Sequence, residues 1–80
     1  MMQISLAAAR VNAGFNQTEA ASRIGITPKT LRGYEQGKVV IPSTTLRKAA
    51  KLYNIPSDNI RLDVIEDGEY DEKILDNTTV

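Results

Sequence analysis

The chain has 80 residues, with ten Lys or Arg, ten Asp or Glu, no Cys and no His. This length suits one small domain, whose core is marginal without a partner or a second copy. The lack of Cys and His excludes disulfides, Cys/His zinc sites and His-dependent triads. We also see no nucleophile–base pair and no metal-binding cluster, and therefore expect no enzyme activity, catalytic residue, metal or cofactor. We see no signal peptide and no apolar run that could cross a membrane, and therefore expect a cytoplasmic protein with no membrane partner.

The zero net charge hides a division between the two ends of the chain. Residues 1–61 carry nine Lys or Arg against three Asp or Glu, a net charge of +6. Residues 62–80 carry one Lys against seven Asp or Glu, a net charge of −6. A basic body is typical of nucleic-acid binding, but an ordinary solvated surface with a charged tail explains the same numbers equally well.

Two short helices are expected at the start of the chain. The first, in SLAAARVNAG, begins at the cap Ser5 and ends at Gly14. Its modest apolar stripe consists of Leu6, Ala9, Val11 and Ala13. The second, in FNQTEAASRIG, has Asn16 and Glu19 at the positions of a capping box. It ends at Gly25, whose freedom at positive φ allows a sharp turn.

A third helix follows this turn after only a few residues, in TPKTLRGYEQG, with Thr27 as its cap and Pro28 in its first position. Two short helices joined so tightly by a glycine must cross steeply. The inward side of the turn and of the third helix consists of Ile24, Ile26, Leu31 and Tyr34. By helical spacing, the opposite face carries Pro28, Lys29, Arg32, Gly33 and Gln36. Gly33 is unexpected there, because glycine inside a helix costs about 1 kcal/mol relative to alanine.

The next part of the chain is expected to form a loop, a fourth helix and a short fifth helical turn. The loop GKVVIPS places Ile41 in the core and leaves Val39 and Val40 exposed. The fourth helix, STTLRKAAKLYN, begins at the cap Ser43. Its apolar face consists of Leu46, Ala49, Ala50 and Tyr53. The fifth turn, in PSDNIRL, is expected to be capped by Ser57.

The end of the chain has a different pattern. Ile60, Leu62 and Val64 alternate with charged residues, which favours a short strand. The acidic residues beyond this point favour an extended or disordered tail. We therefore expect a domain over residues 1–62 and an acidic C-terminal tail over residues 63–80 that begins with the short strand.

One spacing pattern runs through the second and third helices: Q-x3-A-x3-G-[IV]-x4-[IVL]-x2-[YW]-E-x-G. Its positions are Gln17, Ala21, Gly25, Ile26, Leu31, Tyr34, Glu35 and Gly37. The pattern resembles the helix-turn-helix of the Cro and phage-repressor family, also called the xenobiotic-response-element family, and the resemblance extends from about Leu6 to Ile60. It implies an all-α, compact five-helix domain of the lambda-repressor type, followed by the short acidic tail.

The resemblance implies that the third helix lies in the major groove of double-stranded DNA. The residues that it implies as base contacts are Pro28, Lys29, Thr30, Arg32 and Gly33. The residues that it implies as contacts to the DNA backbone are Asn16, Gln17, Thr18, Gln36, Lys38 and Ser43. Gly33 would let the helix backbone approach the bases, and the alternative is a tolerated, mildly destabilising residue. Polar residues at helix ends also serve simply as caps.

Two further sets of contacts are expected. Arg10 and Glu35 form an ion pair between the first and third helices, as family members often do, unless they are two unrelated surface charges. The residues expected in a homodimer contact are Val39, Val40, Ile60, Leu62 and Val64, because exposed apolar side chains need cover. Pro28 departs from the family, since many relatives have a polar base-contacting side chain there. We therefore expect fewer direct contacts between side chains and bases in this protein.

The expected function is that of a sequence-specific transcriptional regulator, a repressor of the phage or prophage Cro type that covers a promoter by binding an operator as a dimer. The first alternative is the antitoxin of a toxin–antitoxin pair, in which a DNA-binding domain is followed by a tail that binds a protein partner. The second alternative is a protein-binding adaptor that retains the fold and does not bind DNA.

Overall fold

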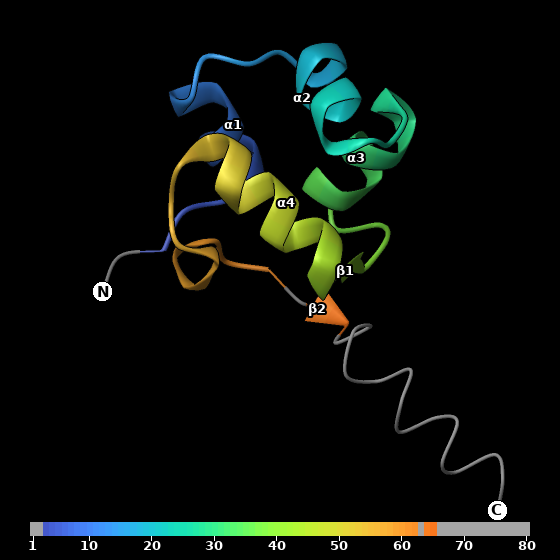
Figure 1. The fold of residues 1–80 in the computed structure, drawn as a ribbon. Helices are drawn as coiled ribbons and strands as arrows, with labels where there is room; N and C mark the ends of the chain where they lie inside the picture. Colours follow the sequence, from blue (N-terminus) through green and yellow to red (C-terminus); the bar gives the residue numbers. More distant parts are fainter. Residues whose placement is uncertain (1–2, 63, 66–80) are drawn as a thin grey trace, which may run out of the picture.

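The elements of the protein follow the order α1–α2–α3–β1–α4–β2 (Figure 1). The structure is a computed structural model, and it describes residues 3–62 and 64–65. The elements within these residues are the helices α1 (Leu6–Asn12), α2 (Gln17–Ile24), α3 (Pro28–Glu35) and α4 (Ser43–Tyr53), the strands β1 (Ile41–Pro42) and β2 (Val64–Ile65), and a 3-10 turn (Ser57–Asn59). The compact helical architecture agrees with the predicted class, but the described residues form four α-helices and not five.

Side-chain caps explain where the first three helices begin. Ser5 Oγ accepts a hydrogen bond from the Ala8 amide (3.0 Å), and Thr27 caps α3 in the same way. Asn16 and Glu19 form the predicted capping box, in which the Glu19 amide donates to Asn16 Oδ1 (2.8 Å). Each cap satisfies an amide group that the first turn of a helix leaves without an intrahelical partner.

Two predicted caps are wrong. Pro42 occupies the cap position of α4, and Ser43 is the first helical residue, only 5% exposed. The fifth helix is reduced to a 3-10 turn that follows Pro56, so Ser57 lies inside the turn and not before it. In both places a proline with extended ψ takes the cap position, and the serine that follows it enters the helical turn.

A glycine turn lets α2 and α3 pack against each other. Gly25 has a φ of +92°, and its amide and that of Ile26 both donate to the Ala21 carbonyl (2.9 Å each). Glycine adopts this φ without strain, which allows the chain to reverse within a few residues. Ala20 and Ala21 have no exposed surface, so α3 and α4 can approach α2 closely.

The hydrophobic core lies between the helices. Its buried side chains are Leu6, Ala9, Ala20, Ala21, Ile24, Leu31, Tyr34, Ile41, Leu46, Ala49, Ala50, Tyr53 and Ile60. The whole apolar face predicted for the fourth helix is buried, whereas Val11 of the predicted first stripe is 61% exposed. Val11 follows the buried Ala9 by two positions, which corresponds to about 200° around a helix and turns its side chain to solvent.

Two short parallel pairings connect distant parts of the chain. β1 pairs with β2, with Ile41 opposite Val64, and Ile4 forms an isolated bridge with Ile60. The predicted strand is therefore limited to this bridge and to the two residues of β2, and the predicted loop contains β1. Ile60 is buried in the core of its own chain, which removes it from the surface predicted for a dimer.

The paired structure reaches Ile65 through β2, beyond the expected domain end at residue 62. The rest of the predicted acidic tail, residue 63 and residues 66–80, lies outside the described residues. In the part of the chain that is described, no helix combines the length and the apolar surface needed to span a bilayer.

Candidate nucleic-acid interface

A buried ion pair holds α3 against α1. Arg10 Nε donates to Glu35 Oε2 (2.7 Å) and Arg10 Nη2 to Glu35 Oε1 (3.3 Å), and the two side chains are 13% and 5% exposed. Arg10 Nη1 also donates to the Phe15 carbonyl (2.9 Å), and Gln17 Nε2 donates to Glu35 Oε1 (2.9 Å). Buried charges are stabilised when they are paired and hydrogen-bonded in this way. The network therefore fixes α3 relative to both α1 and the start of α2.

An aromatic pair anchors the start of α2 to α4. The ring centroids of Phe15 and Tyr53 are 6.2 Å apart, and the Arg23 guanidinium lies 5.6 Å from the centroid of the Phe15 ring. Burial, with a smaller effect of the Glu35 charge, raises the pKa of the Tyr53 hydroxyl to about 12, while the Arg10 charge acts in the opposite direction. This hydroxyl is buried and has no hydrogen-bond partner among the described residues.

The outer face of α3 is polar and cationic. Its exposed side chains are Pro28, Lys29, Arg32 and Gln36. Within the described part of the chain, the charged groups of Lys29 and Arg32 form no hydrogen bond or ion pair. Thr30 is partly buried, and its hydroxyl lies 2.8 Å from that of Thr27. Two unpaired cations on a rigid helix face suit contacts with DNA bases or phosphates.

The loop after α3 folds back over Gly33. The amides of Lys38 and Val39 both donate to the Gly33 carbonyl, at 3.0 and 3.3 Å. A Cβ atom added at Gly33 would lie 3.2 Å from Val39 Cγ2, which is tighter than an ordinary van der Waals contact. Gly37, with a φ of +74°, allows the reversal of the chain. Gly33 thus makes room for Val39, and this side chain occupies the space that was expected to be open to the bases.

A hollow of about 450 Å³ lies on this side of α3. It is lined by Lys29, Thr30, Arg32, Gly33, Gln36, Lys38 and Val39. The structure thus brings together all the predicted base contacts except Pro28, and it places two of the predicted DNA-backbone contacts beside them. Val39, expected only in a dimer contact, was missed as a member of this group.

The remaining predicted DNA-backbone contacts divide into two groups. Asn16, Gln17 and Thr18 lie together at the start of α2, where Asn16 Oδ1 serves the capping box and the side-chain amide of Gln17 bonds to Glu35. The bond between Gln17 and Glu35 couples this helix start to the end of α3. Ser43 differs from them, because its side chain is buried at the start of α4 and not presented at the surface.

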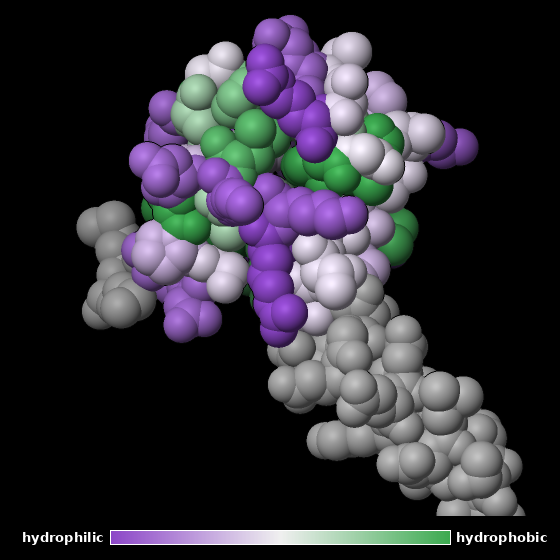
Figure 2. Space-filling model, in the orientation of Figure 1, coloured by the Kyte–Doolittle hydropathy of each residue, from purple (hydrophilic) through white to green (hydrophobic). Residues whose placement is uncertain are grey.

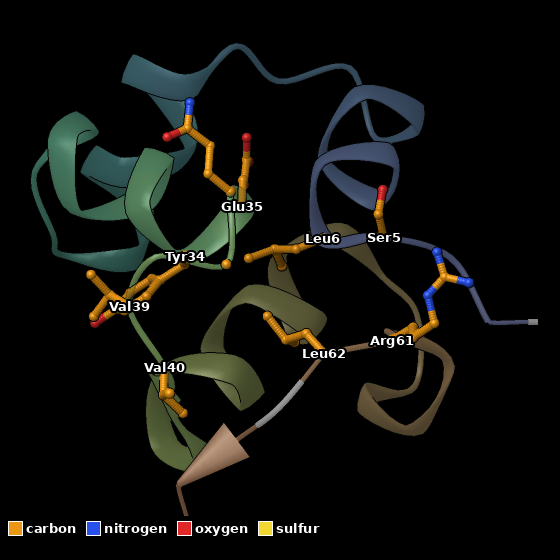
Figure 3. A pocket seen from close by; sticks show the side chains of 10 residues that line it. Ser5, Leu6, Tyr34, Glu35, Val39, Val40, Arg61 and Leu62 are labelled. Atoms are coloured by element: carbon orange, nitrogen blue, oxygen red, sulfur yellow. The ribbon is translucent and has the colours of Figure 1, made fainter.

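A second hollow, a groove of about 280 Å³, lies between the loop after α3 and the end of the domain (Figure 3). Val39 and Val40, which are 51% and 45% exposed, line it with Arg61 and Leu62. Three of the residues predicted for a dimer contact therefore meet at one groove, and Val64 belongs to β2. Arg61 was not predicted as a site residue, because only its apolar neighbours in the alternating pattern indicated a dimer contact.

A further cationic surface lies on α4. Arg47, Lys48 and Lys51 are exposed there, and Figure 2 shows hydrophilic side chains gathered over this helix. These three residues were not predicted as site residues, although the spacing of Arg47 and Lys51 places both on one side of a helix. The cationic surface of the domain is therefore larger than the face of α3.

The short helices α2 and α3 are joined by a glycine turn, and α3 presents a rigid polar face to solvent. This arrangement defines a helix-turn-helix DNA-binding domain. A family model described as "Helix-turn-helix" matches residues 6–60. The chain belongs to this helix-turn-helix family, of the Cro/C1 type, whose members are DNA-binding regulators. Comparisons with curated proteins and with solved structures gave no match.

Proposed function

We propose that this regulator is a repressor of the phage or prophage Cro type, which occupies a promoter by binding an operator in double-stranded DNA as a symmetric homodimer. The observation that carries the proposal is the buried pair of Arg10 and Glu35, because it fixes α3 while Lys29 and Arg32 remain outward and unpaired within the described residues. A helix that is already rigid loses little conformational entropy on binding and presents its side chains in one geometry.

In the proposed complex α3 lies in the major groove, and its side chains have two tasks. Arg32 and Lys29 donate to base edges, where guanine O6 and N7 suit them best. Gln36 and Lys38, with the start of α2, contact phosphates and fix the position of the protein on the duplex. Pro28 has no donor to offer, so the readout depends mainly on the two cations.

We propose a dimer because one α3 covers only a few base pairs, which is too little for a specific site. We propose that the second copy covers the groove beside Val40 and Leu62, because these apolar side chains border a hollow that is open to solvent. A symmetric contact of this kind predicts an operator with an inverted repeat, whose half-site centres lie about one helical turn apart. A single unrepeated half-site bound by a monomer would contradict the dimer.

The test begins with selection of bound sequences from random DNA, followed by footprinting. Arg32→Ala is expected to weaken the selected site by about 1–3 kcal/mol and to relax the preference at one or two base pairs. Lys38→Ala is expected to weaken all sequences alike and to reduce the salt dependence of binding, because a phosphate contact carries no sequence information. Arg47→Ala on α4 is the matched control and should leave the base preference unchanged. An unchanged motif and affinity for Arg32→Ala would remove this residue from the readout.

A second candidate function is that of an antitoxin, and the charge division of the chain favours it. Residues 62–80 contain seven Asp or Glu and one Lys, which suits a basic protein partner such as a toxin. Deletion of residues 66–80 distinguishes the two functions. After this deletion, an antitoxin would no longer bind its protein partner but would keep its DNA affinity. A repressor without such a partner would bind DNA as a dimer both with and without residues 66–80.

A further inference from the structure

We propose that Val39 reads a thymine, by placing its exposed methyl groups against the C5-methyl group of that base. The inference rests on the proposed binding of α3 in the major groove, and it adds a residue outside the helix to the recognition surface. Thymine is the base that the chemistry selects, because its methyl group is the apolar group that base pairs display in the major groove.

Val39 belongs to a loop but is held on α3. Two amides, those of Lys38 and Val39 itself, donate to the Gly33 carbonyl and tie the loop backbone to the helix. The side chain fills the space above Gly33, since a Cβ atom at that position would approach Val39 Cγ2 to 3.2 Å. Gly33 is therefore a positioning residue for Val39, whose side chain is fixed on one side and remains 51% exposed.

The surroundings of Val39 point to DNA. Among the described residues that line the hollow beside α3, Val39 supplies the one wholly apolar side chain. The cations that line the same hollow are Lys29, Arg32 and Lys38. These cations attract phosphates and base acceptors, and so bring the edge of a base pair to the hollow. Contact between Val39 and a methyl group then removes apolar surface from water, which corresponds to about a fourfold gain in affinity for one methyl group.

The experiment replaces each thymine of the selected operator, one at a time, with uracil. Uracil pairs in the same way and lacks only the C5-methyl group. For the wild-type protein, we expect one thymine in each half-site at which this change lowers affinity by about fourfold. In Val39→Ala the uracil effect should disappear at that thymine, because the two changes remove the same contact and their effects should not add.

Val11→Ala is the matched control. Val11 is another exposed valine, 61% exposed, and it lines neither the hollow beside α3 nor the groove of the proposed dimer contact. This variant should retain the full uracil effect. Val39→Thr, which keeps the shape of the side chain and replaces one methyl group with a hydroxyl, should reduce the effect and serves as the second variant if Val39→Ala folds poorly.

Two results would overturn the inference. One is a Val39→Ala protein that keeps the full uracil effect at every thymine. If the dimerisation of that protein is also weakened, Val39 belongs to the dimer contact instead. The other is a wild-type protein that binds thymine and uracil operators equally well. A wild-type protein that selects no sequence from random DNA would instead refute the proposed function itself, and the inference with it.

Discussion

The hydroxyl group of Tyr53 is buried and has no hydrogen-bond partner among the described residues, while the ring that carries it packs against the ring of Phe15. A hydroxyl that leaves water without finding a partner costs free energy, whereas the aromatic ring contributes favourable packing. Tyr53 therefore stabilises the domain through its ring and destabilises it through its oxygen atom.

Tyr53→Phe is expected to leave the free energy of unfolding unchanged or to raise it by about 1–3 kcal/mol. It should also remove a pH dependence, because the pKa of Tyr53 rises from its ordinary 10.0 to about 12 in the folded protein. Above pH 10 the unfolded chain releases a proton that the folded chain retains, so the stability contributed below that pH is lost as the pH rises towards 12.

Urea unfolding of both proteins at neutral and alkaline pH measures this effect. The other titrating groups are common to the two proteins, so the difference between their pH dependences isolates Tyr53. Identical losses of stability between pH 10 and pH 12 would contradict the raised pKa.

The end of α3 is held by Glu35, which connects three segments of the chain through Arg10 and Gln17. Glu35→Ala leaves the Arg10 guanidinium largely buried and without its carboxylate. We expect a loss of about 3–5 kcal/mol in the free energy of unfolding, measured by urea denaturation, because an uncompensated buried charge is costly. That amount is a large part of the stability of a small domain.

The double variant Arg10→Met with Glu35→Leu is the control for this loss. Replacing both charges with apolar side chains of similar size should restore most of the stability, since no buried charge then lacks a partner. A Glu35→Ala protein as stable as the wild type, or a double variant as unstable as the sum of its single variants, would show that the pair does not hold α3.

The helices could be predicted because their signals are local. Ser5, Asn16 and Thr27 cap helices within three residues of their own positions, and a short sequence window contains the whole interaction. The strands could not be predicted in the same way. β1 and β2 have two residues each, which is too short to show the alternating pattern of a strand. Ile41 pairs with Val64, which lies far along the chain, so no short sequence window contains both partners.

The candidate site also contains predictable and unpredictable parts. Helical spacing predicted that Lys29 and Arg32 lie on the outer face of α3, as they do, and their proposed contacts with bases come from the family resemblance. The place of Val39 could not be predicted, because it depends on the reversal at Gly37 and on two hydrogen bonds to a carbonyl in the preceding helix. A glycine in mid-helix was the visible signal, but the sequence did not reveal which side chain would fill the space.

The whole chain separates its charges, with a net charge of +6 in residues 1–61 and −6 in residues 62–80. The positive part includes the exposed cations of both α3 and α4. An anionic segment tethered to a cationic body has a high local concentration there and competes with DNA phosphates. We therefore expect deletion of residues 66–80 to raise the affinity for nonspecific DNA, most strongly at low salt, because charges are screened beyond about 10 Å at 0.1 M salt.

A salt series of DNA-binding measurements on the full and shortened chains tests this competition. A full-length variant with the Asp and Glu of residues 66–80 replaced by Asn and Gln is the matched control, since it keeps the segment and removes its negative charge. It should behave like the deletion. Equal affinities of all three proteins at low salt would contradict the competition and leave the acidic segment with a role in solubility or in binding a protein partner.

The pairing of Ile4 with the far end of the domain affects how the protein is made. The Ile4 amide donates to the Asn59 carbonyl and the Arg61 amide donates to the Ile4 carbonyl, both at 2.8 Å. On the ribosome, Ile4 is synthesised long before either partner exists, and the first residues remain without their pairing until the last part of the core has been added. The domain therefore completes its fold only after Asn59 and Arg61 have been synthesised, and a nascent chain that stalls before Asn59 exposes an incomplete core to chaperones and proteases.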